Sequence, residues 1–294
     1  MPYLGDAMAS VIAQTYGDWS MAVVDDGSTD STARVAAGFS DPRISLIRQE
    51  NRGVSAARNR GIAAGASDAC LFLDADDWLA PGALERLCGA LATAPAAVAA
   101  AGCYARVAHD HRVRFAPGPP CGDVLDRLLV RNLFANGGHL LIRRWAIDMA
   151  GGFRTGLCYG EDWDYWVRLA LLGSFVAVPR RQPLLFVRER PGSAYLRMAT
   201  DPARFEAATN AVYGNPDVIR RFGADGLAAL RRRAEAETAW IIGRELIRHG
   251  DHREGWRWLR GSLRVAPTLK RLGLAGLSRA GIGPFRPYPG ADGG

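Results

Sequence analysis

The sequence predicts an α/β fold with a mainly parallel sheet, followed by an α-helical extension. Through the first hundred residues, short apolar runs rich in Val, Ile, Leu and Phe alternate with amphipathic stretches, which is typical of β-α-β units. Beyond Pro202 the pattern becomes wholly helical and rich in arginine. A chain of 294 residues is long enough for one large α/β domain and an appendage.

The expected strands and helices alternate in the first half of the chain. Strands are expected where short apolar runs occur, at residues 19–24, 44–48 and 70–73. Helices are expected at the amphipathic stretches that surround these runs, at residues 8–15, 31–39 and 55–64. This order of elements predicts consecutive β-α-β units.

Residues 104–202 have a more mixed pattern, with a Pro-rich loop at 117–120, a strand at 139–142 and a helix at 162–172. We place a domain boundary near residue 203, so that residues 1–202 form one domain and residues 203–294 a basic helical extension. Within the extension, residues 240–267 have small residues and a final proline at positions similar to those of one tetratricopeptide-type helical hairpin. One such unit cannot bury a repeat core, so we expect it to pack against the first domain.

The excess positive charge lies in the extension. Residues 1–202 contain 21 Arg and 21 Asp plus Glu, whereas residues 203–294 contain 16 basic and 9 acidic residues. Such a tail either contacts an anionic membrane surface or a lipid-phosphate acceptor, or is a solvated helix face. We expect no nucleic-acid partner, because no basic run is interleaved with stacking aromatic residues.

Composition also bears on location. The five cysteines are scattered and lack metal-ligand spacing, which is typical of reduced thiols in a cytosolic protein. The N-terminus lacks the pattern of a secretory signal, and no apolar stretch reaches the roughly 20 residues that a membrane span requires. We therefore expect a cytoplasmic protein, with peripheral contact at the inner membrane face as the alternative that the basic tail suggests.

Two carboxylates, Asp25 and Asp26, follow the first expected strand and precede a glycine turn. In open α/β sheets, ligands bind outside the carboxyl ends of the strands. A carboxylate there can accept a hydrogen bond from the imide N–H of a pyrimidine base or from a ribose hydroxyl. The alternative is an Asx turn in which Thr29 or Asp30 caps the next helix, but capping gives no reason for Asp25 and Asp26.

A polar loop at residues 51–61 runs directly into an expected helix. It contains Asn51, Gly53 and Arg58, and its backbone amides and arginines can face a diphosphate or a base. A capped surface helix with Arg58 and Arg60 in solvent would have the same pattern, so this segment depends on its neighbours for its interpretation.

Three carboxylates, Asp74, Asp76 and Asp77, follow the expected strand at residues 70–73. Like charges so close together raise one another's pKa unless a cation compensates them. Mg²⁺ and Mn²⁺ favour carboxylate oxygens together with substrate phosphates, so a divalent metal is the expected partner. The alternative is an acidic cap for the helix after Pro81.

The segment at residues 159–168 is acidic at its start and aromatic in its first two turns. Glu161 and Asp162 begin an expected helix, whose dipole keeps a carboxylate ionised and able to accept a proton. Trp163 and Trp166 could stack on a sugar face. In a structural alternative, acidic residues favour the helix start and Asp164 pairs with Arg168 at i, i+4.

Together, in this order and spacing, the four segments resemble the inverting family 2 glycosyltransferases of GT-A fold, over roughly residues 3–193. The resemblance implies a GT-A type nucleotide-sugar-binding fold, with a nucleotide-sugar half at residues 1–103 and an acceptor half at residues 104–202. It also implies a divalent metal, Mg²⁺ or Mn²⁺, and a nucleoside-diphosphate sugar as the donor.

The resemblance assigns roles to the candidate residues. Those implied to hold the donor are Asp25, Asp26, Asn51, Gly53, Arg58, Asp74 and Asp76. Asp74-Ala75-Asp76 is implied to be the Asp-x-Asp motif, and Asp76 or Asp77 to contact the metal. Asp162, beside Glu161, is implied to be the general base. The residues implied to face the acceptor are Gly152, Phe153, Trp163 and Trp166.

The sequence departs from the family pattern at three places. Arg154 stands where an acidic residue is common. Arg190 occupies a position where many relatives carry a metal-contacting His, and we expect it to neutralise the leaving diphosphate instead. The chain opens at Pro2-Tyr3-Leu4 and lacks the apolar first strand, so we expect the functional protein to begin upstream of Met1.

The reaction that the resemblance implies is a single inverting displacement. Asp162 takes the proton of the acceptor hydroxyl, while the metal and arginines stabilise the departing diphosphate. The implied acceptors are growing cell-surface glycans or lipid-linked sugars. The alternative from another class is a truncated or inactive nucleotide-binding or scaffold protein that uses its helical tail for contacts. A dinucleotide-dependent oxidoreductase or a nucleotidyltransferase lacks support, because the glycine-rich fingerprints are absent.

Overall fold

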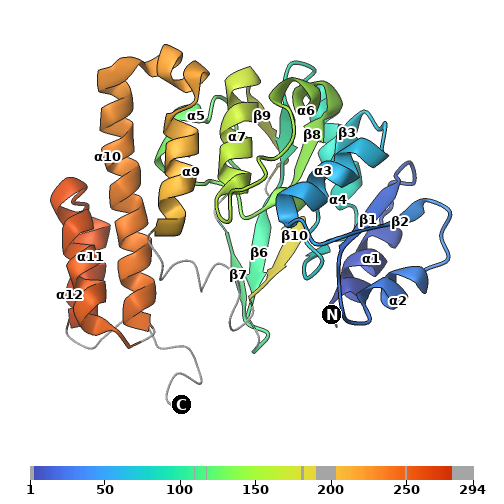
Figure 1. Cartoon of the computed structure of the whole chain (residues 1–294), viewed down its shortest axis with the longest axis horizontal. Coiled ribbons are helices and arrows are strands. Elements are labelled where there is room, and N and C mark those ends of the chain that lie inside the picture. Colours follow the sequence, from blue (N-terminus) through green and yellow to red (C-terminus); the bar gives the residue numbers. More distant parts are fainter. Residues whose placement is uncertain are drawn as a thin grey trace. The chain divides into compact units, whose positions relative to one another are not determined.

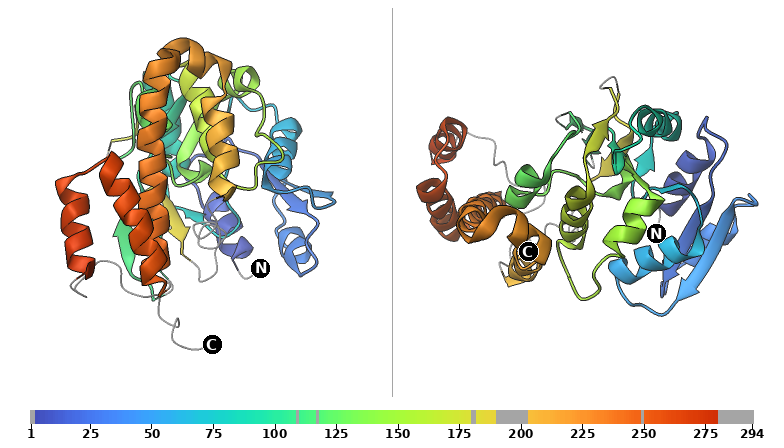
Figure 2. Two further views of the ribbon diagram at one scale, coloured as in Figure 1. Left: turned by 60° about the vertical axis from the view of Figure 1, so that its left-hand side comes forward. Right: turned by 90° about the horizontal axis from the view of Figure 1, so that it is seen from above.

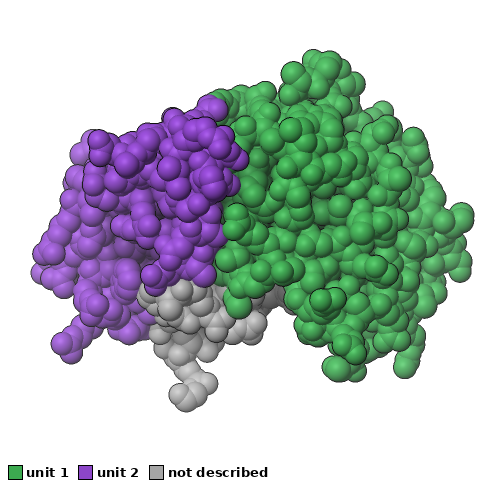
Figure 3. Space-filling view, turned by 45° about the horizontal axis from the view of Figure 1, so that its top comes forward, with its two compact units in different colours: residues 1–125, 133–190 green, residues 126–132, 191–294 purple. Residues whose placement is uncertain are grey.

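The computed structural model describes residues 3–108, 110–116, 118–179, 182–189, 203–248 and 250–279 (Figure 1). The chain divides into two compact units, which Figure 3 shows in different colours. Unit 1 comprises residues 1–125 and 133–190, and unit 2 comprises residues 126–132 and 191–294. On sequence grounds we placed residues 126–132 in the first domain. They belong to unit 2, where the Tyr213 hydroxyl donates a hydrogen bond to the Leu129 carbonyl.

Unit 1 begins with alternating helices and strands. These elements are α1 (Leu4–Ile12), β1 (Met21–Asp26), α2 (Thr32–Ala37), β2 (Ile44–Gln49) and α3 (Val54–Ala64). β1 and β2 pair in parallel, from Met21 opposite Ile44 to Asp26 opposite Gln49. Leu4, Met8 and Ala36 form the buried core beneath them. The parallel register places the ends of both strands, with their polar side chains, at one edge.

The other strands of unit 1 form two four-stranded sheets. One sheet has the order β3 (Ala69–Cys70), β8 (Leu140–Arg143), β5 (Ala99–Ala101) and β9 (Phe175–Ala177). The other has the order β4 (Trp78–Leu79), β10 (Leu185–Arg188), β6 (Tyr104–Val107) and β7 (Val113–Phe115). The helical segments that accompany them are α4 (Ala83–Thr93), the 3₁₀ turn η1 (Gly137–His139), α6 (Arg144–Ala150) and α7 (Glu161–Leu172). Leu87, Leu184 and Leu185 are among the buried residues of the main core.

The strands combine parallel and antiparallel pairs. The pairs β1–β2, β6–β10 and β5–β9 are parallel, whereas β3–β8, β5–β8, β4–β10 and β6–β7 are antiparallel. β8 causes two of the antiparallel pairs, because it lies between β3 and β5 and runs against both. β6 and β7 follow each other in the chain after a short turn, which favours an antiparallel pair.

The strand expected at residues 70–73 is shorter in the structure. β3 covers only Ala69–Cys70, and residues 71–73 join no ladder within the described chain. β1 and β3 belong to different sheets, and in the residues described neither pairs along its second edge. Leu71 and Leu73 nevertheless pack against the main core. Apolar burial therefore holds this segment in place without a full set of strand hydrogen bonds.

The described part of unit 2 is helical. Its elements are α5 (Leu125–Val130), whose first residue lies in unit 1, and α9 (Ala203–Tyr213), α10 (Pro216–Arg248), α11 (His252–Val265) and α12 (Leu269–Arg279). α10 and α11 lie side by side (Figures 1 and 2). A Cβ atom on Gly243 would lie 2.7 Å from the Gly255 carbonyl oxygen, so only glycine permits this approach. None of the helices in the described residues combines the length and the apolar character that crossing a membrane requires.

Candidate functional site

Asp25 stabilises the turn at the end of β1. Its carboxylate is buried and accepts hydrogen bonds from the Ser28 backbone N–H at 2.9 Å and from Arg48 Nε at 3.1 Å. Hydrogen bonds from Ser28, and then from Arg48, lower the pKa of Asp25 below its ordinary value. Asp25, which we predicted to contact the donor, therefore already has partners in the protein that fix the turn.

Asp26 connects β1 to the loop that precedes α3. Its Oδ1 accepts from Gln49 Nε2 at 2.7 Å and from the Arg52 N–H at 2.9 Å, and its Oδ2 accepts from the Gly53 N–H at 2.8 Å. Burial raises the pKa of Asp26, but these hydrogen bonds outweigh burial and lower it. Asp26 thus lies at the N-terminus of α3, where the helix dipole favours a carboxylate.

Glycine residues permit the close approach of the two turns. Gly27 has φ +75°, and a Cβ atom there would lie 2.7 Å from the Asn51 backbone nitrogen. Gly53, directly before α3, has φ +87°, a conformation that other residues rarely adopt. Asn51 is exposed beside them. The structure therefore brings the first two sequence segments together at one edge of the β1–β2 pair.

Arg58 joins three of the predicted segments. It lies on α3, and its guanidinium donates to Asp74 Oδ1 and to Glu161 Oε1, both at 3.0 Å. Burial alone lowers the pKa of Arg58, but the charges of Asp74, Glu161 and Asp162 outweigh burial and raise it. The predicted donor and base segments, far apart in the sequence, therefore meet at this one side chain.

Asn136, which sequence reasoning missed, holds two of the three adjacent carboxylates. Its Nδ2 donates to Asp77 Oδ2 at 2.6 Å and to Asp74 Oδ2 at 3.1 Å, and its Oδ1 accepts from the Gly138 N–H at 2.8 Å. Asn136 is buried. The sequence signal that could have found it is the Gly137-Gly138 pair that follows, since paired glycines are typical of a close approach between chain segments. In the structure a Cβ atom on Gly137 would lie 2.7 Å from Phe72 Cβ.

Asp77 does not suit the role of metal ligand that we predicted as one alternative. It is 2% exposed, and its Oδ1 accepts from the Arg188 backbone N–H at 2.9 Å while Oδ2 accepts from Asn136. Burial, with a contribution from the charges of Asp74 and Asp76, raises the pKa of Asp77 to about 7. Its burial, more than its two hydrogen bonds, separates Asp77 from a metal that substrate phosphates also bind.

Arg188 is a second residue that we did not predict. Its Nε donates to the Asp76 carbonyl oxygen at 3.1 Å, and its Nη2 donates to Asp6 Oδ2 at 2.9 Å. The guanidinium also lies over the Trp78 ring, 4.6 Å from its centroid. Arg188 therefore fixes the backbone of the acidic turn. Arg190, the predicted diphosphate contact, lies outside the described residues.

The donor atoms of the acidic turn fit a divalent metal that substrate phosphates also bind. The described residues include no group of three or more His, Cys, Asp or Glu arranged to hold a metal ion. Mg²⁺ commonly binds to proteins through only one or two carboxylates, together with substrate phosphates. Asp76 is half-buried in this turn between two other carboxylates, and a cation would compensate the repulsion between their charges. Asp76 is thus the carboxylate that fits this role.

The start of α7 carries the predicted base. Asp162 is half-buried in the first turn, and its Oδ1 accepts from the Trp163 N–H at 2.7 Å. The alternative interpretation of Asp164 is confirmed, because this buried carboxylate pairs with Arg168 Nε at 2.9 Å and also with Arg154 Nε at 3.1 Å. The carboxylates in the first turn of α7 thus differ in role: Asp164 stabilises the structure, whereas Glu161 and Asp162 do not share its ion pairs.

Trp166 cannot stack on a sugar, and Phe153 cannot face an acceptor, as we predicted for each of them. Trp166 is 0% exposed and Phe153 is 3% exposed. Both rings belong to an aromatic cluster in which Phe153 lies 4.1 Å from Tyr165 between ring centroids. Trp163, by contrast, is half-buried and remains the aromatic candidate on this helix.

Gly152 is required by the packing of the loop before α7. A Cβ atom on Gly152 would lie 2.6 Å from Asn59 Oδ1. Asn59 donates to the Phe153 carbonyl at 2.8 Å and accepts from the Phe153 N–H at 2.7 Å. Asn59 thereby attaches the predicted acceptor segment to α3, next to Arg58.

Residues 1–148 match the family model described as Glycosyl transferase family 2. The succinoglycan biosynthesis protein ExoU of Rhizobium meliloti (strain 1021) is 36% identical over 185 residues, and the match covers 57% of this chain and 53% of ExoU. The matched segments make up 12%, 53% and 25% of the first three curated relatives, so this chain spans about half of their length or less.

Two solved structures resemble the fold over nearly the whole chain. S. aureus TarS 1–349, in complex with UDP-GlcNAc, has a TM-score of 0.56 at 13% identity and covers 96% of this chain and 89% of its own. The mannosyltransferase PcManGT from Pyrobaculum calidifontis, in complex with GDP-Man and Mn²⁺, has a TM-score of 0.56 at 18% identity, covering 95% of this chain and 76% of its own. These likenesses confirm the predicted fold class, a GT-A type α/β fold with C-terminal helices.

Proposed function

Because the chain belongs to glycosyl transferase family 2, we propose that it moves a sugar from a nucleoside-diphosphate sugar to an acceptor hydroxyl with inversion. The observation that supports this proposal best is the position of Arg58, which contacts the Asp-x-Asp turn through Asp74 and the base helix through Glu161. One side chain thus sets the spacing between the group that would bind the donor and the group that would activate the acceptor.

The donor would lie at the edge where β1 and the start of α3 meet. Asp26 accepts bonds from the backbone of Arg52 and Gly53, so its main effect is to shape the loop that carries the exposed Asn51. A carboxylate has about four acceptor positions, and Asp26 uses three, which leaves one for the nucleoside. Asn51 and Gly53 would contact the nucleoside beside it.

The metal would be Mg²⁺ or Mn²⁺, held by Asp76 together with the donor diphosphate. Bound there, it would neutralise charge that develops on the departing diphosphate. Asn136 and Arg188 would act as positioning residues, because they fix Asp74, Asp77 and the backbone of Asp76. Arg190 stays a proposed diphosphate contact.

Asp162 would be the general base. The N-terminus of α7 favours a carboxylate at this position, and Glu161 is occupied by Arg58. Asp162 would take the proton of the acceptor hydroxyl while that oxygen bonds to the anomeric carbon. The bond from this carbon to the diphosphate oxygen would break at the same time, which inverts the anomeric centre. Trp163 would lie against the acceptor.

The acceptor class and the location are also proposals. We propose a growing cell-surface glycan or a lipid-linked sugar as the acceptor, and a cytoplasmic enzyme. ExoU, a relative that shares 36% identity with part of this chain, is named as a succinoglycan biosynthesis protein. That name supports the choice of a glycan acceptor.

The test is turnover of a panel of nucleotide sugars by the full chain, with Mg²⁺ or Mn²⁺ and with chelator. We expect hydrolysis or transfer with at least one donor and loss of turnover in chelator. Asp162→Asn should lower turnover by about 10²–10⁴-fold, with donor affinity nearly unchanged. Asp148→Asn, at an exposed position on α6, is the matched control. Asp162→Asn activity within tenfold of the unmodified chain would refute the base assignment.

A second candidate is a nucleotide-binding protein without turnover. In the described chain β1 pairs only with β2, and its second edge is unpaired. Asp25 and Asp26 stand at the end of this strand, so a strand without a second partner would hold these donor-site residues less firmly, which favours this candidate. Nucleoside-diphosphate binding with no turnover of any donor in the panel would support the second candidate over the first.

A further inference from the structure

α11 has two faces of different character in unit 2. Gly255, Leu259 and Ser262 are buried, and Trp240 and Ile247 of α10 belong to the same core as Leu259. Four arginines with helical spacing are exposed on the opposite face, namely Arg253, Arg257, Arg260 and Arg264. Since the apolar face of α11 is already covered by α10, the arginine face points outward.

An apolar surface follows directly after these arginines. Val265 is 52% exposed at the end of α11, and Leu269 and Leu272 in the first turn of α12 are 90% and 51% exposed. Leu269 and Leu272 are three residues apart and therefore neighbours on the helix surface. Residues 255–279 contain no Asp or Glu. Exposed aliphatic and basic groups thus occur together there, and the carboxylate beside them is Glu254, which lies 3.4 Å from Arg257.

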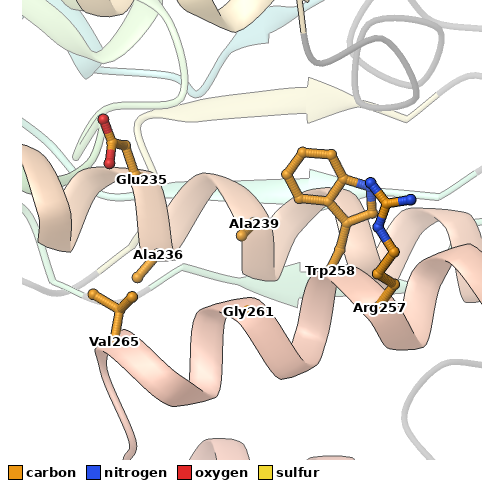
Figure 4. Close-up of a pocket in the computed structure, with 7 residues that line it drawn as sticks. All are labelled: Glu235, Ala236, Ala239, Arg257, Trp258, Gly261 and Val265. Carbon is orange, nitrogen blue, oxygen red and sulfur yellow. The ribbon is translucent and has the colours of Figure 1, made fainter.

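A groove between α10 and α11 extends this surface (Figure 4). Its volume is about 290 Å³, and Ala236, Ala239 and Gly261 line its middle. Glu235 and Val265 lie at one end, and Arg257 and Trp258 lie at the other (Figure 4). Tryptophan is enriched where a protein meets the membrane–water interface, because its ring is apolar and its N–H is polar.

We propose that the α11–α12 surface, made of Arg253, Arg257, Arg260, Arg264, Val265, Leu269 and Leu272, docks on an anionic lipid bilayer. The arginines attract acidic headgroups, while the leucines enter the boundary between headgroups and acyl chains. Each arginine near such a surface contributes about fivefold to binding at low ionic strength, and each buried leucine about tenfold. This inference goes beyond the proposed transfer reaction and does not depend on it.

The experiment is sedimentation of the full chain with vesicles. Vesicles of phosphatidylcholine alone are compared with vesicles that also contain phosphatidylglycerol, at low and at high salt. We expect binding only to the anionic vesicles and weaker binding at high salt. Leu269→Ser with Leu272→Ser, or Arg253, Arg260 and Arg264 all changed to Gln, should each lower binding by about 100-fold.

Two matched controls separate this surface from general charge or hydrophobicity. Val113→Ser with Phe115→Ser removes exposed apolar groups from β7 in unit 1, and the other control changes Arg220, Arg232 and Arg233 of α10 to Gln. Both should bind as the unmodified chain does. An equal loss in a control, or no binding to anionic vesicles, would overturn the proposal. Circular dichroism verifies folding of each variant. A lipid-independent dimer that the leucine variant abolishes would assign the surface to a second copy of the chain and also overturn it.

Discussion

Replacing Arg58 with methionine tests whether the predicted segments depend on one side chain. Methionine retains an apolar stem near Phe153 but removes the bonds to Asp74 and Glu161. A hydrogen bond to a charged group contributes about 1.5–3 kcal/mol. Glu161 is 14% exposed, which places its bond in the upper part of this range. Asp74 is 35% exposed and screened by solvent, so its bond is worth nearer to about 1 kcal/mol.

We therefore expect Arg58→Met to lower the free energy of unfolding by about 3–4 kcal/mol. The measurement is urea unfolding of the full chain, followed by tryptophan fluorescence and circular dichroism. Arg60→Met is the matched control, because Arg60 lies on the same helix and is exposed. It should change the free energy of unfolding by no more than about 0.5 kcal/mol.

A double-mutant cycle identifies the partner. Glu161→Gln removes one of the two charges that Arg58 pairs with and leaves Asp74 in place, so the loss of unfolding free energy caused by Arg58→Met should be about 1–3 kcal/mol smaller in that background than in the unmodified chain. Effects that add within about 0.5 kcal/mol would refute the assigned contact. A cost for Arg58→Met no larger than that for Arg60→Met would refute the central role of Arg58.

Three further predictions concern stability. Asn136→Ala should lower the free energy of unfolding by about 1–3 kcal/mol and weaken donor binding, because Asp77 loses a donor; unchanged donor affinity would contradict a positioning role. Gly152→Ala should lower the free energy of unfolding by about 1–3 kcal/mol, because the added Cβ clashes with Asn59. Gly5→Ala is the control and should be neutral or stabilising, because no atom lies within 4 Å of its added Cβ. Equal melting temperatures of the two variants would contradict the contact. Burial lowers the pKa of His139 from 6.5 to about 4. The unfolded chain therefore binds a proton before the folded chain does, and the free energy of unfolding should fall by at most about 3 kcal/mol as the pH drops between these values. His139→Gln should remove that part of the dependence in urea titrations, and an unchanged slope would disprove the assignment.

The sequence by itself predicted the local elements and the candidate residues. The apolar runs before Asp25 and at residues 44–48 placed β1 and β2 within two residues of their ends, because strand formation follows the local pattern of apolar side chains. α3 and α7 each begin one residue before their expected starts. The resemblance to the glycosyltransferase family was also predictable, since its motifs are contiguous short segments.

Only the tertiary structure decided how these segments meet. Arg58 bonds to Glu161, a residue 103 positions away, and no local pattern encodes such a distance. The same holds for Asn136, which meets Asp77 across 59 positions, and for Arg188, which meets Asp77 across 111. Trp166 has an aromatic side chain of the kind that stacks on sugars, but the packing of Phe134 and Phe153 against it buries the ring. Side-chain exposure and pairing across the fold depend on which surfaces face one another, and chain neighbours alone do not fix this.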